Sequence, residues 1–117
     1  MATYTKLALS DSTNGRPIKV VATATAGTDI HTAVAGTDDF DEIWLYCVNT
    51  DTVTRLLTIE WGGVSDPDDL IEVNIPAQNG LVLVVPGLIL QNSLDVAAFA
   101  SAANVLIISG WVNRITA

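Results

Sequence analysis

The stretch TIEWGGVSDPDDLIEV, residues 58–73, gathers five acidic side chains around a turn that contains proline and glycine. Carboxylates at close spacing can hold a divalent cation or act as acid and base. The calcium loop of an EF-hand needs a central glycine and a glutamate at its twelfth position, and SDPDDLIEV has neither feature. A looser ion site would use Asp66, Asp68 and Asp69, but acids in a strand connection are usually solvated turn formers. We therefore expect no metal site in this loop.

A second acidic group, formed by Asp38, Asp39, Asp41 and Glu42, precedes the apolar run IWLYC. An ion site is again conceivable. Charges beside an apolar strand also oppose pairing between exposed sheet edges. We interpret this group as a solvated one and expect no metal here either.

Aromatic residues raise the possibility of sugar chemistry. A glycosidase would need paired carboxylates in a groove with aromatic platforms, one of them with a raised pKa. Trp44, Trp61 and Trp111 all lie within strand patterns. This placement favours packing in the core or at an interface, with sugar stacking as the alternative.

The chain has one histidine, His31, and one cysteine, Cys47. They cannot form a zinc site without two further ligands. Cys47 lies in the apolar run IWLYCV, where a thiol is buried and unreactive, and we expect His31 at the surface or in a strand. The pair Gly62-Gly63 is followed by no Gly-Lys-Ser/Thr sequence, so it builds no phosphate loop. We expect no enzyme, no catalytic residue and no cofactor.

These residues must be positioned by strands, because strand patterns cover most of the chain. Apolar and polar residues alternate from residue 18 to residue 25, and DEIWLYCVN is a continuous apolar run with polar ends. Further strand patterns are LLTIEW, LIEVNI, LVLVV (stopped by Pro86-Gly87), a short LIL, LDVAAFA and NVLIISGWVNRI. Ala favours helix, so VAAFASAAN could compete, but we predict a strand and a turn there.

About eight short strands separated by turn signals predict an all-β fold, either a β-sandwich or a jelly-roll-like barrel. We expect a single domain over residues 18–117, preceded by an N-terminal arm or first edge strand over residues 1–17. The predicted core comprises Ile43, Leu45, Leu57, Ile59, Ile71, Val73, Val82, Val84, Leu106 and Ile108.

Charge divides the chain unevenly. Residues 1–28 hold Lys6, Arg16 and Lys19 against one acid, a balance of +2, and the other 89 residues hold two cations against twelve acids, a balance of −10. We predict that these three cations bind a partner, either the acidic body of a neighbouring copy or another protein surface. The net charge of −8 argues against nucleic acid as the main partner. We also expect no secretory signal, no membrane helix and no small-molecule ligand.

The order of the stretches GRPIKVVATATAGTDIHTAV, DEIWLYCVNT, LTIEWGG, LVLVVPGLIL and ISGWVNRI resembles small virion structural proteins of tailed bacteriophages. The size and single β domain are most similar to capsid decoration, or cement, proteins. This resemblance implies a protein made in the host cytoplasm that binds the major capsid protein on the outer capsid surface, commonly as a homotrimer. It implies no catalytic residues.

Two other functions remain open at this point. The chain could be a tail, baseplate or fibre component with the same fold class. It could also be a carbohydrate-binding β-sandwich in which exposed Trp and Tyr side chains line one face with acids at its rim.

Overall fold

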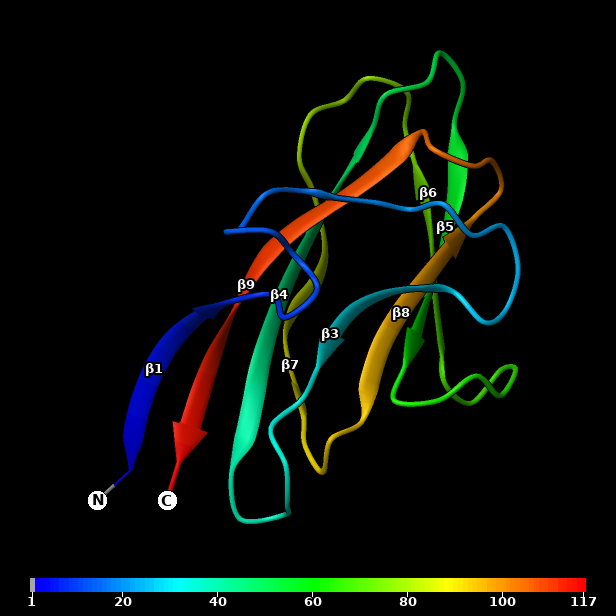
Figure 1. The fold of residues 1–117 in the computed structure, drawn as a ribbon. Coiled ribbons are helices and arrows are strands. Elements are labelled where there is room, and N and C mark those ends of the chain that lie inside the picture. The colour runs from blue at the N-terminus through cyan, green and yellow to red at the C-terminus, as the bar shows by residue number, and fades with distance from the viewer. Residues whose placement is uncertain (1) are drawn as a thin grey trace.

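The computed structural model describes residues 2–117, and within that range the chain is all-β, without a helix (Figure 1). No helix of the described chain is therefore long and apolar enough to cross a membrane. Two antiparallel sheets pack into a β-sandwich, which confirms the predicted fold class. The strands are β1 (Thr3–Ala8), β2 (Ile18–Lys19), β3 (Thr28–Thr32), β4 (Phe40–Asn49), β5 (Arg55–Trp61), β6 (Leu70–Ile75), β7 (Val82–Leu90), β8 (Asp95–Ala100) and β9 (Leu106–Thr116).

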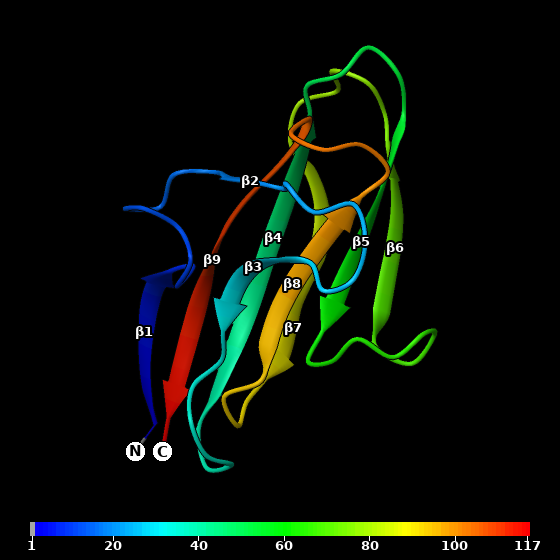
Figure 2. The ribbon, with the colours of Figure 1, turned by 45° about the vertical axis from the view of Figure 1, so that its right-hand side comes forward.

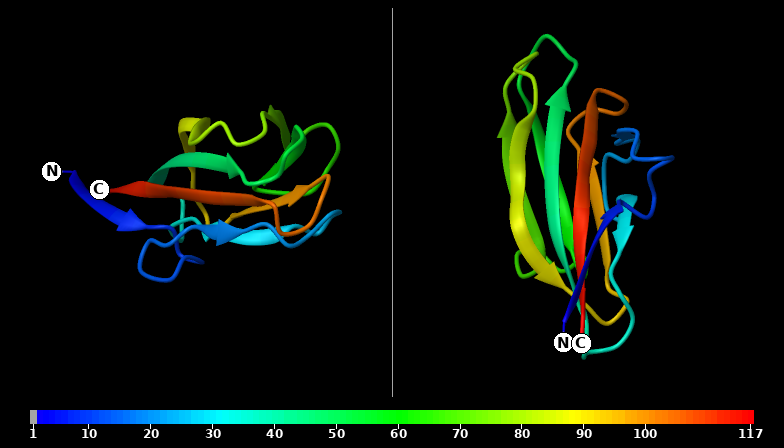
Figure 3. Two further views of the ribbon diagram at one scale, coloured as in Figure 1. Left: turned by 90° about the horizontal axis from the view of Figure 1, so that it is seen from above. Right: turned by 90° about the vertical axis from the view of Figure 1, so that its left-hand side faces the viewer.

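Sheet A has five strands in the order β1-β9-β4-β7, and β2 pairs with the same edge of β9 as β1 does. Sheet B has four strands in the order β3-β8-β5-β6. Figure 2 shows sheet B in front of sheet A, and Figure 3 shows that β1 and β2 lie at one lateral edge of sheet A while β7 lies at the other. The sandwich therefore has two different lateral edges.

The alternation of side chains in β4 explains how the layers pack. Ile43, Leu45 and Cys47 point toward sheet B and are fully buried, whereas Trp44 and Tyr46 point away from sheet B and are half-buried. Side chains two apart share one face of a strand. The run is apolar on both faces, yet only its inner face is fully covered by this chain.

Most of the predicted core is confirmed. Seven of the ten predicted side chains are buried, and the other three, Ile71, Val73 and Val82, are partly buried against the core. These three lie on β6 and β7, the last strands of their sheets, where one flank has no neighbour. Edge position accounts for their partial exposure.

The prediction that Pro86-Gly87 ends a strand is wrong. Strand β7 runs through both residues, and its register with β4 shifts between Ile43 and Trp44. Proline has no backbone N–H group to donate to a neighbouring strand. Pro86 is tolerated because β7 is an edge strand. Gly87 has a φ of +79°, which a residue without a Cβ adopts easily. The pair forms an irregularity within the strand.

The prediction of a strand over residues 18–25 is correct only at its start. Ile18–Lys19 pair with β9, but the following residues leave sheet A and cross toward sheet B. Thr28 Oγ1 accepts hydrogen bonds from the backbone N–H groups of Val21 and Ala22, both at 3.1 Å. These bonds replace ladder bonds in the crossing segment. The strand and turn predicted for VAAFASAAN are observed, since β8 ends at Ala100.

Residues 3–8 form β1, the first edge strand, and do not extend away from the body as an arm. Six residues of β1 pair with β9, from Thr3 opposite Thr116 to Ala8 opposite Trp111. Five of the six β1 side chains are exposed, so β1 adds little to the core. Leu9, immediately after β1, is buried and attaches the segment to the body.

Candidate functional site

The outer face of sheet A, meaning the face turned away from sheet B, carries a strip of aromatic rings. Trp44 of β4 lies directly opposite Trp111 of β9, with ring centroids 5.7 Å apart and planes 10° apart. Tyr46 also stacks on Trp111, with ring centroids 5.9 Å apart and planes 25° apart. Cross-strand pairs of this kind stabilise a sheet, and here they also leave three half-buried rings on one surface.

Gly87 makes room for the ring of Trp44. A Cβ atom at position 87 would lie 2.8 Å from Cζ2 of Trp44, closer than van der Waals contact allows. The indole therefore occupies the space that a side chain on β7 would fill. The aromatic strip extends from β9 across β4 to the edge strand as a result.

Polar groups border the strip. Glu42 Oε1 accepts hydrogen bonds from Trp44 Nε1–H at 2.7 Å and from the Asn113 amide at 3.0 Å. These two bonds hold the pKa of Glu42 below its usual value. The Lys6 ammonium lies over the Trp111 ring, 5.3 Å from its centroid. Such a cation–π contact is worth about 0.5–1 kcal/mol at an exposed site.

Exposed apolar side chains flank the strip at both margins. Tyr4 on β1 is 73% exposed, and Leu83 and Ile89 on β7 are 45% and 56% exposed. Their register partners are Ile115, Tyr46 and Glu42, so they lie on the outer face. This face thus presents aromatic and aliphatic surface across the width of sheet A. Exposed apolar side chains gathered on one face are typical of a binding surface.

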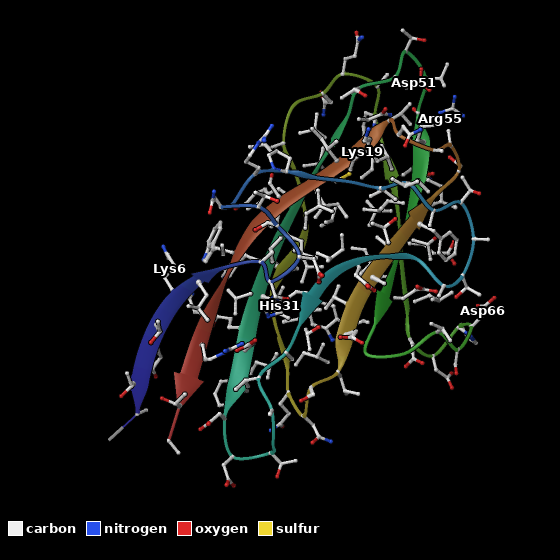
Figure 4. The ribbon with its side chains drawn as sticks, viewed as in Figure 1. Lys6, Lys19, His31, Asp51, Arg55 and Asp66 are labelled. Atoms are coloured by element: carbon white, nitrogen blue, oxygen red, sulfur yellow. The ribbon has the colours of Figure 1, made fainter. Side chains whose placement is uncertain are left out.

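The predicted partner-binding cations lie at one edge of the sandwich. Lys6 is on β1, Lys19 is on β2 and Arg16 is in the connection between them, and all three are exposed. Figure 4 shows Lys6 on the side of the molecule opposite Asp66, and Lys19 in the upper part of the view. Only Lys6 belongs to the aromatic strip.

The acidic loop that begins after β5 is a solvated turn. Asp66 and Asp68 are exposed, and Asp69 Oδ2 accepts the Ser65 N–H at 3.1 Å. The backbone of Asp69 also accepts a hydrogen bond from Trp61 N–H at 2.8 Å. Within residues 2–117 no three His, Cys, Asp or Glu side chains are grouped to hold a metal ion.

Asp41 is the residue for which the solvated interpretation is wrong, since its side chain is fully buried. It accepts hydrogen bonds from Arg114 Nε and Nη2 at 2.8 and 2.9 Å, from His31 Nε2 at 2.8 Å and from Val34 N–H at 3.1 Å. Burial would raise the pKa of Asp41, but the hydrogen bonds from Arg114 and His31 more than offset it and lower the pKa. The carboxylate is a buried structural anchor.

His31 is not at the surface but 2% exposed on β3. Its Nδ1 atom accepts the backbone N–H of Ser10 at 3.0 Å, and its Nε2 atom faces Asp41. A nucleophilic triad would place a hydroxyl where the Ser10 amide lies. His31 therefore ties the segment after β1 to both sheets and does not activate a nucleophile.

Glu60, one of the five acids of residues 58–73, is a second buried carboxylate. It is 2% exposed and accepts hydrogen bonds from the Thr25 hydroxyl and, at 2.7 Å, from Gly27 N–H. Two shallow hollows of about 260 and 280 Å³ flank it. Because both oxygens are bonded, Glu60 fastens the crossing segment over sheet B.

Cys47 and Trp61 are the remaining residues that the sequence analysis considered for a functional site. Burial raises the pKa of the Cys47 thiol to about 12, so almost no thiolate forms at neutral pH. Trp61 packs half-buried against the core between the sheets. Neither residue belongs to the outer face of sheet A.

Comparisons with protein-family models, with curated proteins and with solved structures find no match to this chain.

Proposed function

We propose that this chain is a non-enzymatic virion structural protein that binds the outer surface of a bacteriophage capsid as a decoration protein. The observation that carries the proposal is the outer face of sheet A, where Trp44, Tyr46 and Trp111 lie between exposed apolar side chains. Aromatic residues at the centre of a surface are typical of protein interfaces. The resemblance to capsid decoration proteins implies the major capsid protein as the partner.

The outer face of sheet A is a rigid surface. The stacked rings are held by cross-strand pairing and by the Glu42 hydrogen bonds, so they lose little conformational freedom on binding. Glu42 is the single carboxylate on the central strands of this face, which limits repulsion of a partner by the acidic body. A shell protein that contributes an apolar patch would cover the aromatic strip on this face.

The test is to add the recombinant protein to particles that lack it and to count bound copies by electron microscopy. We expect many copies distributed over the shell. Trp111→Glu should abolish attachment, whereas Val53→Glu, at an exposed site in the β4–β5 connection, should not. Labelling at one end of the particle would contradict the capsid assignment and favour a tail or baseplate component.

A second function is favoured by one feature of the same face. The aromatic strip has Glu42, Asn113 and Lys6 beside it, and stacked rings with neighbouring hydrogen-bonding groups can bind the faces of sugar rings. Glycan-array binding that is lost in Trp111→Ala, together with no attachment to particles, would support this carbohydrate-binding alternative.

A further inference from the structure

Two Asn-Gly dipeptides lie in connections of the fold, Asn14-Gly15 between β1 and β2 and Asn79-Gly80 between β6 and β7. All four residues are exposed. An asparagine followed by glycine can lose its side-chain amide without an enzyme, because the backbone nitrogen of the next residue can attack the side-chain Cγ atom. Glycine favours this attack, since it has no side chain and its backbone adopts many conformations. The two dipeptides therefore differ only in their structural surroundings.

Asn14-Gly15 is held in a closed turn. The φ angles of Asn14 and Gly15 are 54° and 81°, and positive values at both central residues are typical of a type I′ turn. The N–H of Arg16 donates to the Thr13 carbonyl at 3.0 Å and closes this turn. The N–H of Gly15 donates to Ser12 Oγ at 3.3 Å. The nitrogen that would attack is thus hydrogen-bonded, and the turn must open before it can react.

The Ser12 hydroxyl that holds Gly15 is itself anchored. Ser12 Oγ donates to the Leu9 carbonyl at 2.7 Å, and the Ser12 N–H donates to the same carbonyl at 3.0 Å. Leu9 is buried in the core. The turn is therefore attached to the body of the protein, which opposes its local opening.

Asn79-Gly80 has no such attachment. The last backbone bond before it is from Gln78 N–H to the Asn49 carbonyl at 2.9 Å, and the pairing of β7 with β4 begins after it, at Val82. Among the residues that the structure describes, none accepts a hydrogen bond from the Gly80 N–H. Apart from its chain neighbours, nothing lies within 4 Å of a Cβ atom built on Gly80. The Gly80 nitrogen is therefore free to react.

We propose that Asn79 is a site of spontaneous modification, at which the protein converts to a mixture of aspartate and isoaspartate. The closed turn around Gly15 protects Asn14 from the same reaction. This proposal does not depend on what the outer face of sheet A binds.

The reaction needs only water. Hydroxide removes the proton from the Gly80 nitrogen, which forms a bond to Cγ of Asn79. The Cγ–Nδ2 bond breaks, and Nδ2 takes a proton from water and leaves as ammonia. Water then opens the resulting succinimide ring. Attack at Cγ gives aspartate, and attack at the main-chain carbonyl carbon of residue 79 gives isoaspartate.

The modification changes the connection that leads into β7. Both products add one negative charge to a chain whose net charge is −8. Isoaspartate also inserts a methylene group into the main chain shortly before Val82, where β7 begins. The pairs of β7 nearest to this insertion are Val82 with Cys47 and Leu83 with Tyr46. The isoaspartate form therefore alters the end of β7 that borders the Tyr46 ring.

The experiment follows both dipeptides in one sample of the full chain, incubated at body temperature and mildly alkaline pH. Ion-exchange chromatography measures the more acidic form, and mass spectrometry of proteolytic peptides assigns the change to Asn79 or Asn14. In native protein Asn79 should react at least about tenfold faster than Asn14, a ratio that corresponds to about 1.4 kcal/mol of opening free energy for the turn. In urea, where the turn is lost, the two should react at similar rates.

Two variants separate the roles of the residues. Ser12→Ala removes the acceptor of the Gly15 N–H, so it should speed the reaction of Asn14 in folded protein and leave that of Asn79 unchanged. Asn79→Gln is the matched control, since its longer side chain closes the ring far more slowly and the main acidic form should disappear. Circular dichroism melts check that both variants are folded.

Equal rates at the two sites in native protein, or an Asn79 that reacts only in urea, would overturn the proposal. An Asn14 rate that Ser12→Ala leaves unchanged would overturn the protection assigned to the turn.

Discussion

Asp41 and Arg114 lie directly opposite each other on β4 and β9 and form two hydrogen bonds, at 2.8 and 2.9 Å. The carboxylate is fully buried, while the guanidinium side chain is 30% exposed. The pair joins two strands of sheet A, and His31 connects it to β3 of sheet B. One buried anion therefore links both layers.

Removing the arginine should destabilise the fold strongly. In Arg114→Ala the Asp41 carboxylate stays buried without its charged partner, and we expect the free energy of unfolding to fall by about 2–4 kcal/mol. Arg55→Ala is the control, because Arg55 and Asp51 are 30% and 23% exposed and such a pair contributes less than about 1 kcal/mol. Urea denaturation measures both values. Equal losses in the two variants would contradict the structural role of Asp41.

Acid should weaken the protein partly through Asp41. Its folded pKa is lowered, because the hydrogen bonds from Arg114 and His31 outweigh the opposing effect of burial. The unfolded chain therefore binds this proton at higher pH than the folded chain does. The stabilisation is complete above the ordinary carboxyl pKa of about 3.9 and is lost as the pH falls through the lower, folded value.

Asp41→Asn should remove this acid-dependent part. We expect the loss of unfolding free energy between about pH 5 and about pH 3 to be smaller in Asp41→Asn than in wild type, although the variant is less stable at every pH. Urea titrations across that range provide the comparison. An identical pH dependence in both proteins would show that Asp41 has an ordinary pKa.

Local patterns predicted the strands and the core because a half-buried strand repeats every two residues. Ile43 and Leu45, or Leu57 and Ile59, can be assigned to one face from sequence alone. The aromatic strip was partly visible in the same way. Trp44 and Tyr46 are two residues apart on one strand, so they share a face, but Trp111 joins them only through the pairing of β4 with β9.

Long-range partners explain what sequence patterns could not predict. In the sequence, Asp41 looks like its solvated neighbours, because Arg114, the partner that lies opposite it in the fold, is 73 residues away. Glu60 is buried by a segment 35 residues earlier in the chain. Burial of an acid depends on such partners, and nothing in its immediate neighbours signals them.

Cys47 should be inert in the folded protein. Burial raises the pKa of its thiol to about 12, and the side chain is fully covered. We expect a thiol-reactive disulfide reagent to modify native protein at least about a hundredfold more slowly than protein in urea. Absorbance of the released thiolate gives both rates. Rapid modification of native protein would place Cys47 at the surface.

Ile59 tests the core of the sandwich. It is fully buried on β5, and Ile59→Ala should lower the free energy of unfolding by about 2–5 kcal/mol. Ile71→Ala is the control, because Ile71 lies opposite Ile59 on the edge strand β6 and is only half-buried. We expect the smaller loss there. Chemical denaturation measures both losses. A larger loss in Ile71→Ala than in Ile59→Ala would contradict the packing.

Gly87 tests whether the aromatic strip depends on β7. Gly87→Ala combines two costs, since its φ is +79° and the new Cβ would lie 2.8 Å from Cζ2 of Trp44. Gly15→Ala has only the first cost, because Gly15 has a φ of +81° with nothing within 4 Å of an added Cβ. Both should lose about 1 kcal/mol from backbone strain, and Gly87→Ala should lose about 1–3 kcal/mol more.

The displaced indole provides a second measurement. Stacked tryptophans contribute to the near-ultraviolet circular dichroism, so Gly87→Ala should change that signal and weaken attachment to particles, while Gly15→Ala should leave both unchanged. Trp44→Phe shows how much of the signal comes from the stacked pair. If Gly87→Ala matched Gly15→Ala in stability and in spectrum, the Trp44 ring would not rest on Gly87, and the outer face of sheet A would end at β4.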